Sequence, residues 1–330
     1  MLMPYVDVEP YLRAPGRGCV QLTPCVEGGR RHLAAADPAE KEPVVFPMTA
    51  GQPVLIDFCH SVASRDWFAG STAAASPVAR HQQWPRKVKG MLLGTASISA
   101  RNVRRFRDCL PPDAVVLMIG GATEGMGTQV LYDDPRVRQI AFDIYPSALT
   151  HFVADAHRIP LADQCVDAVC VQAVLEHVVD PACVVAEIER VLRPDGLVYA
   201  ETPFMQQVHE GAYDFTRFTE LGHRWLWRRF AAIARGPLGG PGLSLYWSSR
   251  YFLRGLLRSR RAADLVSVPF GVLALADRVM ARGDLIDGAS GAFFLGRKRE
   301  EAIDHSGLVS EYLGAQRSKA KVSSSPTVTP

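Results

Sequence analysis

A glycine-rich turn directly after a continuous apolar segment is the feature that most limits what this chain can fold into. Residues 114–119 read Ala-Val-Val-Leu-Met-Ile, and glycines follow at positions 120, 121, 125 and 127. An apolar run of this length is typical of a parallel strand that is covered on both faces. Glycine lets the backbone turn sharply and lets a ligand approach closely, because it has no Cβ. The pattern therefore predicts the first strand of an open α/β sheet, with a ligand site where that strand ends.

Beyond this turn the sequence alternates between strand and helix patterns. In the clearest helix, Asp180 suits the N-cap, Pro181 the first turn and Gly196 the end. Its apolar residues, at positions 184, 185, 188, 191 and 192, recur at helical spacing and would cover one sheet face. Further strands are predicted at 139–143, 151–154, 168–172, 197–201 and 292–297. This alternation predicts an α/β fold, Rossmann-like, with a mostly parallel sheet and helices on both faces.

The composition along the 330 residues indicates four parts. Residues 1–60 form a small lobe punctuated by proline and glycine, and residues 61–110 form a connector and a helix. The alternating strands and helices occupy residues 111–299. Residues 300–330 have too little apolar content to offset the entropy of ordering, so a disordered tail is predicted there.

Charge and hydropathy exclude several classes of partner. The formal net charge is only +3, which is too small to indicate nucleic-acid binding without clustering, so no DNA partner is expected. The N-terminus has no basic region followed by an apolar stretch, as a signal peptide would. Since no apolar run approaches the roughly 20 residues of a membrane-spanning helix, a cytoplasmic protein is the expectation.

Acidic residues at the ends of the next two predicted strands narrow the choice of ligand. Asp143 ends the second strand, where an acid can accept hydrogen bonds from ribose hydroxyls, and Asp155 follows the third. The competing interpretation is a dinucleotide-binding dehydrogenase, whose fingerprint is G-x-G-x-x-G. Here the loop reads G-G-x-x-x-G-x-G and contains Glu124, an unfavourable neighbour for a pyrophosphate. The cationic sulfonium of S-adenosylmethionine (SAM) suits that acid better, so the sequence favours SAM.

Three stretches, residues 153–169, 173–181 and 187–198, resemble a known family. Residues 114–299 resemble class I SAM-dependent methyltransferases of the methyltransferase-11 type, which implies a seven-stranded sheet closed by an antiparallel strand at 292–297. The resemblance implies that the loop at 120–127 wraps the amino-acid part of SAM and that Asp143 holds the ribose. It also implies that Asp155 and Ala156 flank the adenine and that Gln172 lies beside the sulfonium. The predicted cofactor-binding residues are Gly120, Gly121, Thr123, Glu124, Gly125, Asp143, Ile144, Asp155, Ala156 and Gln172.

Two departures from the family pattern leave a non-catalytic SAM-fold scaffold or partner protein as an alternative. Met118 and Ile119 stand where an acid is usual near the end of the first strand, and Glu124 is a nearby replacement. Only about a dozen residues separate Asp143 from Asp155, so the helix between those strands must be shortened to a loop or turn.

Residues 203–219 carry the candidates for the methyl-acceptor site, because they follow the strand predicted at 197–201. His209 is a candidate general base, since the pKa of histidine lies near working pH. Tyr213, Asp214 and Arg217 are candidates for orienting the acceptor. The alternative is that these residues anchor the loop, with Asp214 and Arg217 paired and Tyr213 packed.

The N-terminal segment has a likeness of its own. Residues 46–57 resemble the small zinc-ribbon-like domain related to the activator subunit of tRNA and protein methyltransferases. The paired C-x-x-C ligands are missing, since Cys19 and Cys25 are spaced C-x5-C without a second pair. We therefore expect a degenerate lobe without zinc, and the sequence predicts no metal ligands elsewhere.

A basic cluster precedes an apolar stretch at residues 265–276. Its members are Arg254, Arg258, Arg260 and Arg261. Such a pair of features can indicate contact with a membrane surface. The favoured interpretation is a helix that covers the substrate cleft.

Together these features predict a cytoplasmic SAM-dependent methyltransferase acting on a small-molecule or carbohydrate-like biosynthetic intermediate. Methylation of a tRNA or protein is a less favoured function, and its RNA form is weakened because residues 111–299 carry no basic cluster beyond the four arginines at 254–261. The sulfonium is already activated, so the protein mainly has to align the acceptor, the methyl carbon and the sulfur.

Overall fold

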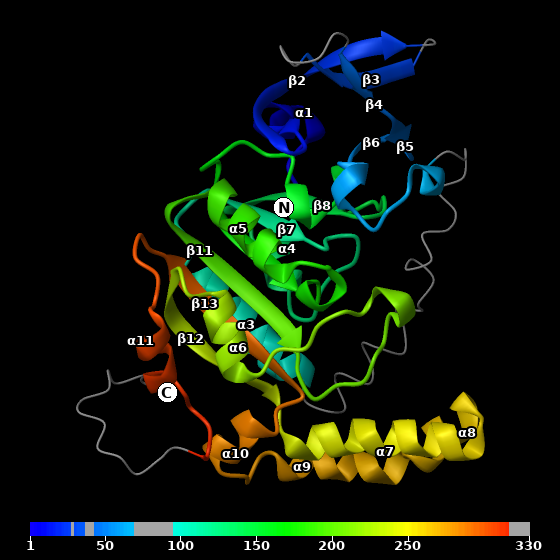
Figure 1. Ribbon diagram of the computed structural model, residues 1–330, viewed down its shortest axis with the longest axis vertical. Helices are drawn as coiled ribbons and strands as arrows, with labels where there is room; N and C mark the ends of the chain where they lie inside the picture. The colour runs from blue at the N-terminus through cyan, green and yellow to red at the C-terminus, as the bar shows by residue number, and fades with distance from the viewer. Residues whose placement is uncertain (28–29, 37–42, 69–94, 317–330) are drawn as a thin grey trace.

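The computed structural model describes residues 1–27, 30–36, 43–68 and 95–316. One large sheet has helices on both faces, and a smaller antiparallel sheet belongs to the N-terminal segment (Figure 1). Across the large sheet the strands are β12 (Phe230–Gly239), β13 (Gly291–Lys298), β11 (Leu192–Pro203), β10 (Val166–Gln172), β7 (Ala114–Ile119), β8 (Val137–Asp143), β9 (Phe152–Ala154), β6 (Gln52–Leu55) and β5 (Met48–Thr49).

The predicted α/β fold class is confirmed. Strands β11, β10, β7, β8, β9 and β6 run parallel, while β13 is antiparallel to both β11 and β12. Strands β7 to β13 are the seven that the family resemblance implies. The sheet is larger than expected, because β5 and β6 of the N-terminal segment extend it past β9.

The central strand β7 shows why the sheet is covered on both faces. Val115 and Leu117 belong to the apolar cluster that contains helix α5 (Pro181–Val191). Val116 and Met118 belong to the opposite cluster, which contains Phe106 of helix α3 (Thr95–Asp108). Successive side chains of a strand point to opposite faces, so a fully apolar strand needs a cover on each side.

Helix α5 begins as predicted and ends earlier. The Asp180 carboxylate caps it by accepting hydrogen bonds from the backbone N–H groups of Ala182 and Cys183, both at 3.0 Å. The prediction that Gly196 ends the helix is wrong: α5 stops at Val191, and β11 begins at Leu192. Leu192 was assigned to the helix because its spacing fits, but its backbone is extended and its side chain is still buried.

Two connections around the sheet are short. Helix α4 spans only Gln129–Tyr132 after the glycine-rich loop. Residues 144–151, all of which the structure describes, contain no helix, which confirms the expected shortening between β8 and β9. Strand β12 was not predicted from the sequence, because its Ala-Arg-Gly-Pro stretch lacks a run of strand-favouring residues.

The N-terminal segment packs onto the large sheet. It contains α1 (Tyr5–Val8), β1 (Arg13–Ala14), β2 (Arg17–Glu27), β3 (Arg30–Ala35) and β4 (Val44–Phe46), and these four strands form the antiparallel sheet. Val8 and Leu12 are buried in the same cluster as β7. The backbone N–H of Met3 donates to the carbonyl of Gln139 in β8 at 3.0 Å. The domain boundary predicted at residue 60, between the N-terminal lobe and the connector, stays a prediction.

A helical arm follows β12. It comprises α7 (Pro241–Leu257), α8 (Arg260–Val266), the short helix at Val268–Val272 and α9 (Leu273–Ala276), and α10 (Arg282–Asp287) leads from it to β13. Figure 1 shows α7 lying beside α8 and α9 along one end of the molecule. None of the helices within the described residues is long and apolar enough to cross a membrane.

The start of the predicted disordered tail is packed against the domain instead. Residues His305–Ser310 form α11, which lies against α6 (Glu220–Leu226). The buried guanidinium of Arg224 donates to Glu311 at 2.8 Å. Composition could not reveal this ion pair, because it joins residues 87 positions apart. Residues 317–330 lie outside the described residues.

Candidate active site

A cavity of about 1020 Å³ opens where the parallel strands β7, β8, β10 and β11 end. The residues predicted to bind the cofactor all line it, from Gly120 after β7 to Gln172 at the end of β10. His209 and Tyr213 also line it, whereas Asp214 and Arg217 do not. The structure therefore brings together all of the predicted cofactor residues and two of the four predicted catalytic residues.

The glycine-rich loop lies against the protein as well as along the cavity. A Cβ on Gly125 would lie 2.0 Å from Oε1 of Gln172, and one on Gly127 would lie 2.4 Å from the Cα of Ala100 in α3. Gly127 also has a φ of +82°, in the left-handed region. At Gly127 glycine is needed so that the loop can pack against the backbone of α3, whereas at Gly125 the end of the Gln172 side chain would have to move; the sequence did not reveal either contact.

Asp143, at the end of β8, carries a carboxylate that the backbone holds in place. Its Oδ2 accepts a hydrogen bond from the N–H of Ala122 at 3.0 Å, and its Oδ1 accepts one from the N–H of Ile144 at 2.7 Å. Burial raises the pKa of Asp143 to about 6, because desolvation outweighs these backbone hydrogen bonds. The carboxylate is therefore mostly ionised at neutral pH and has lone pairs left for donors on a ligand.

Asp155 links three parts of the chain. Its Oδ2 accepts from the hydroxyl of Ser61 at 2.5 Å, and its Oδ1 accepts from Nδ1 of His157 at 2.6 Å. Nε2 of His157 accepts from the backbone N–H of Asp180 at 3.0 Å, so this ring is neutral with its proton on Nδ1. Burial opposes ionisation of Asp155, but the hydrogen bonds from His157 and Ser61 outweigh it and lower the pKa. Asp155 thus joins the N-terminal segment and the start of α5 to the cavity wall.

Gln172 and Glu201 are paired at the ends of β10 and β11. Glu201 is only 5% exposed and accepts hydrogen bonds from the hydroxyls of Tyr199 and, at 3.2 Å, Ser99. Burial raises the pKa of Glu201 despite these hydrogen bonds. Nε2 of Gln172 donates to the carbonyl of Met126 at 3.1 Å, which ties the strand end to the glycine-rich loop.

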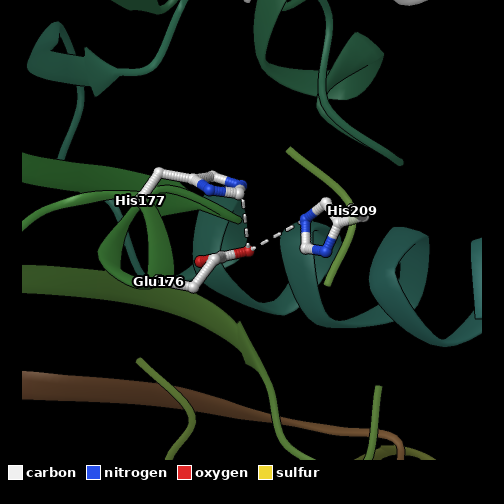
Figure 2. Close-up of side chains that lie close together, drawn as sticks. All are labelled: Glu176, His177 and His209. Atoms are coloured by element: carbon white, nitrogen blue, oxygen red, sulfur yellow. Dashed lines mark ion pairs between the residues drawn. The ribbon is translucent and has the colours of Figure 1, made fainter. Parts of the chain in front are cut away.

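A group of three ionisable side chains, Glu176, His177 and His209, lies on another part of the lining. Glu176 and His177 come from a short helix after β10 (Leu175–His177), and His209 comes from the loop after β11. Oε1 of Glu176 lies 3.7 Å from Nε2 of His177 and 3.8 Å from Nε2 of His209 (Figure 2). Glu176 is fully buried, and burial raises its pKa to about 8.

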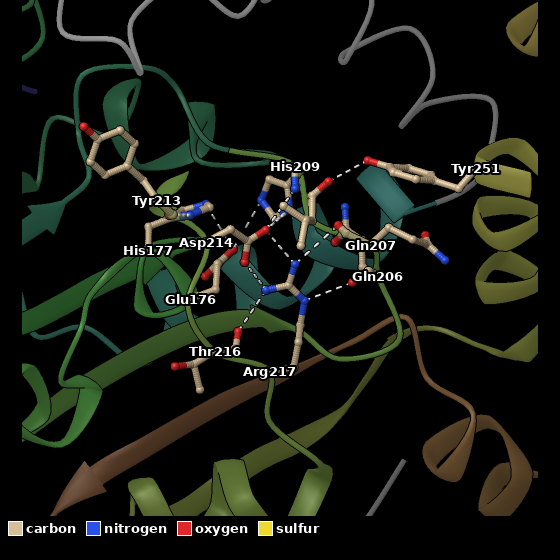
Figure 3. Close-up of polar contacts among 11 residues, drawn as sticks. Glu176, His177, Gln206, Gln207, His209, Tyr213, Asp214, Thr216, Arg217 and Tyr251 are labelled. Carbon is tan, nitrogen blue, oxygen red and sulfur yellow. Dashed lines mark hydrogen bonds and ion pairs between the residues drawn. The ribbon is translucent and has the colours of Figure 1, made fainter. Parts of the chain in front are cut away.

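Asp214 and Arg217 lie next to His209, outside the cavity lining, and hold its loop (Figure 3). The guanidinium of Arg217 donates to both carboxylate oxygens of Asp214, one of them at 2.7 Å, and to the carbonyl of Gln206 at 2.9 Å. Oδ2 of Asp214 lies 3.3 Å from Nδ1 of His209. Burial opposes ionisation of Asp214, but the hydrogen bonds from Arg217 and from the His209 backbone lower its pKa to about 2. These contacts support the loop-anchoring interpretation for Asp214 and Arg217.

Aromatic and apolar side chains complete the lining. The ring of Tyr213 packs edge-on against Trp67 of the N-terminal segment, with ring centroids 5.8 Å apart. Leu238 of β12 and Leu243 and Trp247 of α7 line the cavity on the side of the helical arm. The apolar stretch at 265–276, which was predicted to form a helix that covers the cleft, contributes no residue to this lining; Leu243 and Trp247 belong to the first turns of α7 instead.

Sequence reasoning did not select Glu176, His177 or Glu201 as site residues. All three lie at or just after the carboxyl end of a strand, which is where ligands bind in open α/β sheets. The ionisable pair Glu176–His177 directly after β10 was the available signal, but it was used only as part of the family resemblance.

Comparison with known proteins identifies the central part of the chain. Residues 120–200 match the family described as Methyltransf_11, methyltransferase domain. This segment contains the glycine-rich loop, Asp143, Asp155, Gln172 and the pair Glu176–His177, and the match confirms the resemblance inferred from the sequence. No curated protein matches the chain.

Solved structures of methyltransferases are similar at low identity. A SAM-dependent methyltransferase from Archaeoglobus fulgidus is 12% identical, with a TM-score of 0.42 over 66% of this chain and 100% of that one. A putative sarcosine dimethylglycine methyltransferase from Galdieria sulphuraria is 15% identical, with a TM-score of 0.40 over 68% and 91%. A complex between the Haloferax volcanii Trm112 methyltransferase activator and a putative methyltransferase gives 17% identity and a TM-score of 0.40 over 64% and 95%. The zinc-ribbon-like likeness of the N-terminal segment stays a prediction.

Proposed function

Since the chain carries a SAM-dependent methyltransferase domain, we propose that its cavity holds SAM beside a small-molecule or carbohydrate-like acceptor and transfers the methyl group between them. The observation that carries this proposal is that every predicted cofactor residue shares one cavity with His209. In the proposed arrangement, the loop at 120–127 and Asp143 bind SAM. The acceptor then lies between the polar group Glu176, His177 and His209 and the apolar wall at Trp247.

The size and chemistry of the cavity support an acceptor of modest size. About 1020 Å³ is at the upper end of the roughly 300–1000 Å³ found for small-molecule sites, which suits two small ligands better than a polymer. An acceptor with polar groups at one end and apolar surface at the other would match the lining. Asp214 and Arg217 serve as positioning residues for His209, because they hold its loop from outside the cavity lining.

Calorimetric titration with SAM, followed by a metabolite screen with methyl-labelled SAM, tests this function. We expect one SAM per chain and transfer of label to a small acceptor. Absence of binding at high micromolar SAM would contradict the proposal. Binding without transfer to any small molecule would point instead to a scaffold or to a macromolecular acceptor.

The affinity for SAM is expected to fall as the pH drops through about 6. The pKa of Asp143 is raised to about 6, so the carboxylate is ionised above that pH and protonated below it. Ribose hydroxyls need the ionised form as an acceptor, so affinity should decrease by about tenfold per pH unit below the pKa. Calorimetry between about pH 5 and pH 8 measures the change. In Asp143→Asn, which does not titrate, the affinity should be weaker but independent of pH over this range.

His209→Ala is expected to leave SAM affinity within about twofold of the parent protein and to slow turnover by about 100-fold. The reason is that His209 contacts Glu176 and His177 and is not among the predicted SAM-binding residues. Single-turnover rates with the acceptor found in the screen, compared with calorimetric affinity for SAM, separate the two effects. Unchanged turnover would remove His209 from the acceptor site.

A further inference from the structure

We propose that Glu176, His177 and His209 bind a divalent transition-metal ion at the acceptor end of the cavity. One ligand atom from each residue, a carboxylate oxygen or an imidazole nitrogen, lies within 4.8 Å of the other two. Figure 2 shows the Glu176 carboxylate between the two imidazole rings. The site is additional to the predicted SAM residues, and the sequence predicted no metal ligands.

The buried Glu176 carboxyl group is placed where a cation would stabilise its ionised form. Glu176 is 0% exposed, and no other described residue donates a hydrogen bond to either of its carboxylate oxygens. Burying a carboxylate without hydrogen bonds is costly, so buried acids are normally paired, protonated or bound to a metal. Its Oε1 is directed at two imidazole nitrogens rather than at a guanidinium or an ammonium group.

Both histidines are oriented as metal ligands usually are. Nδ1 of His177 lies 2.6 Å from the carbonyl oxygen of Tyr213, which can only accept, so Nδ1 carries the proton and Nε2 has a free lone pair. Metal-binding histidines typically donate their other ring N–H to a carbonyl or a carboxylate, as His177 does. Nδ1 of His209 lies 3.3 Å from Oδ2 of Asp214, which places a carboxylate on the side of the ring away from Glu176. Nε2 of each histidine therefore lies on the side of its ring that faces the Glu176 carboxylate.

The spacing and the ligand types favour a transition metal. With metal–ligand distances of about 2.1 Å, neighbouring ligand atoms lie about 3.0–3.4 Å apart. The Glu176 oxygen lies 3.7 and 3.8 Å from the two imidazole nitrogens, and all three ligand atoms lie within 4.8 Å of one another, so side-chain rotations that draw the two histidines together would reach this spacing. Two imidazoles with one carboxylate suit ions such as Zn²⁺, Co²⁺ or Fe²⁺ rather than Mg²⁺ or Ca²⁺, which prefer oxygen. Three protein ligands leave at least one position open.

The open position would serve the acceptor, an inference that rests on the proposed methyl transfer. All three ligands line the cavity, so an oxygen of the acceptor can reach the ion. A coordinated hydroxyl has a lowered pKa, as metal-bound water does. The ion would therefore hold a hydroxyl-bearing acceptor and favour loss of the hydroxyl proton to solvent. As the O–CH3 bond forms, the S–CH3 bond of SAM would break and S-adenosylhomocysteine would leave.

Titration of the chelator-treated full-length chain with Co²⁺ alone tests the site without SAM or an acceptor. We expect one ion per chain, visible d–d absorption that indicates nitrogen ligation, and a higher unfolding temperature. Glu176→Gln should weaken Co²⁺ binding by about 100-fold, and Asp214→Asn by about 10-fold through its contact with His209. Glu201→Gln is the matched control: it removes another buried acid of the same cavity that is not one of the three ligands, and it should weaken Co²⁺ binding far less than Glu176→Gln does.

Metal binding that Glu176→Gln does not weaken, or no binding to the parent protein, would overturn the proposal in favour of a protonated Glu176. The unfolding temperature of the metal-free variant shows whether it has folded. SAM titration of the same samples separates this outcome from failure of the proposed function, because the metal titration requires neither SAM binding nor turnover.

A second, independent observation concerns the helical arm, residues 241–280. From it we infer that the arm docks on an anionic lipid surface. Its apolar side chains are unusually exposed: Phe252 68%, Leu256 66%, Leu265 74%, Val268 65%, Val272 63% and Val279 88%. On α7, Leu245, Phe252 and Leu256 are seven and four residues apart, which places them on one face of the helix. These side chains all belong to one segment of the chain, and exposed apolar patches mark interaction sites.

Charge on the arm favours lipid as the occupant. Arg258, Arg260 and Arg261 are exposed at the turn between α7 and α8, next to the apolar residues. Arginines that flank an apolar helical surface bind anionic headgroups while the apolar side chains enter the acyl boundary. The cores of self-association interfaces, in contrast, are depleted in charged residues. Leu243 and Trp247 of α7 line the cavity, so docking would bring the acceptor end of the cavity close to the bilayer.

Sedimentation with vesicles tests this inference. The full chain should bind vesicles of phosphatidylcholine with phosphatidylglycerol, more strongly than phosphatidylcholine alone, and less strongly at high salt. Leu256→Ser/Leu265→Ser should reduce binding by about tenfold or more, and Arg258→Gln/Arg260→Gln by about fivefold per arginine. The matched control is Val26→Ser/Val309→Ser, which removes apolar side chains that are 76% and 71% exposed elsewhere on the chain.

Failure to bind either vesicle would contradict the inference, as would equal loss of binding in the control variant. If light scattering shows a dimer that Leu256→Ser/Leu265→Ser converts to a monomer, the face is an interface between two copies of this chain, and the lipid proposal is wrong.

Discussion

Asp143→Ala is expected to reduce SAM affinity by about 100-fold or more while the protein stays folded. Hydrogen bonds to a charged acceptor contribute about 1.5–3 kcal/mol each, and a tenfold change in affinity corresponds to about 1.4 kcal/mol. Losing two hydrogen bonds to the ribose should therefore weaken SAM binding more than any other single substitution on the cofactor side of the cavity. The carboxylate also holds the backbone N–H of Ala122, so its removal loosens the loop that should contact SAM.

The control for this change is Asp167→Ala. The Asp167 carboxylate also accepts a hydrogen bond from a backbone N–H of the sheet, that of Val115 at 2.8 Å, but it does not line the cavity. We expect Asp167→Ala to lower the free energy of unfolding without changing calorimetric SAM affinity. If both variants lost affinity equally, general loosening of the sheet would explain the effect. If Asp143→Ala bound SAM normally, the ribose assignment would be wrong.

The central sheet could be predicted because its strands carry strong local signals. In β7 every residue is apolar, and no helix of ordinary amphipathic pattern would bury all six of them. Strand β6 also carries a short strand-like pattern, at 53–57, but its pairing with β9 at the edge of the large sheet could not be predicted. Strands β12 and β5 were harder, because they are short or rich in glycine and proline and are stabilised by pairing with other strands. Such pairing depends on tertiary context rather than on propensity.

The cofactor side of the candidate site was predictable for a related reason. Gly120, Asp143 and Gln172 each follow a strand, and parallel strands place their carboxyl ends at one edge of the sheet. The packing reasons for Gly125 and Gly127 were not visible, because their neighbours Gln172 and Ala100 lie far along the chain.

The acceptor side required the structure. Glu176 and His209 are 33 positions apart, and only the fold places the carboxylate oxygen 3.8 Å from the imidazole nitrogen. The roles of Asp214 and Arg217 could not be decided from the sequence either, because residues three positions apart can both contact a substrate or can pair with each other. Their bidentate contact and their place next to His209, outside the cavity lining, favour pairing.

Gly127→Ala is expected to destabilise the protein by about 3 kcal/mol, the largest effect on folding of any methyl group added to this loop. The left-handed backbone at φ +82° costs a residue with a Cβ about 1–2 kcal/mol. In addition, the new Cβ would lie 2.4 Å from Cα and 2.7 Å from N of Ala100, and these backbone atoms of α3 cannot rotate away as a side chain could. Overpacking of this kind adds about 1–3 kcal/mol. Equilibrium urea unfolding measures the change.

Gly51→Ala separates the two contributions. Gly51 has nearly the same φ, +80°, but a Cβ there would meet no atom within 4 Å. This variant should therefore show only the backbone cost of about 1–2 kcal/mol. The difference between the losses of unfolding free energy in Gly127→Ala and Gly51→Ala measures how strongly the close contact between the glycine-rich loop and α3 opposes an added methyl group. Because that contact holds the loop against the cavity wall, SAM affinity should fall in Gly127→Ala and stay unchanged in Gly51→Ala. Equal losses of stability in the two variants would mean that α3 does not constrain the loop, and the close packing proposed for Gly127 would then be wrong.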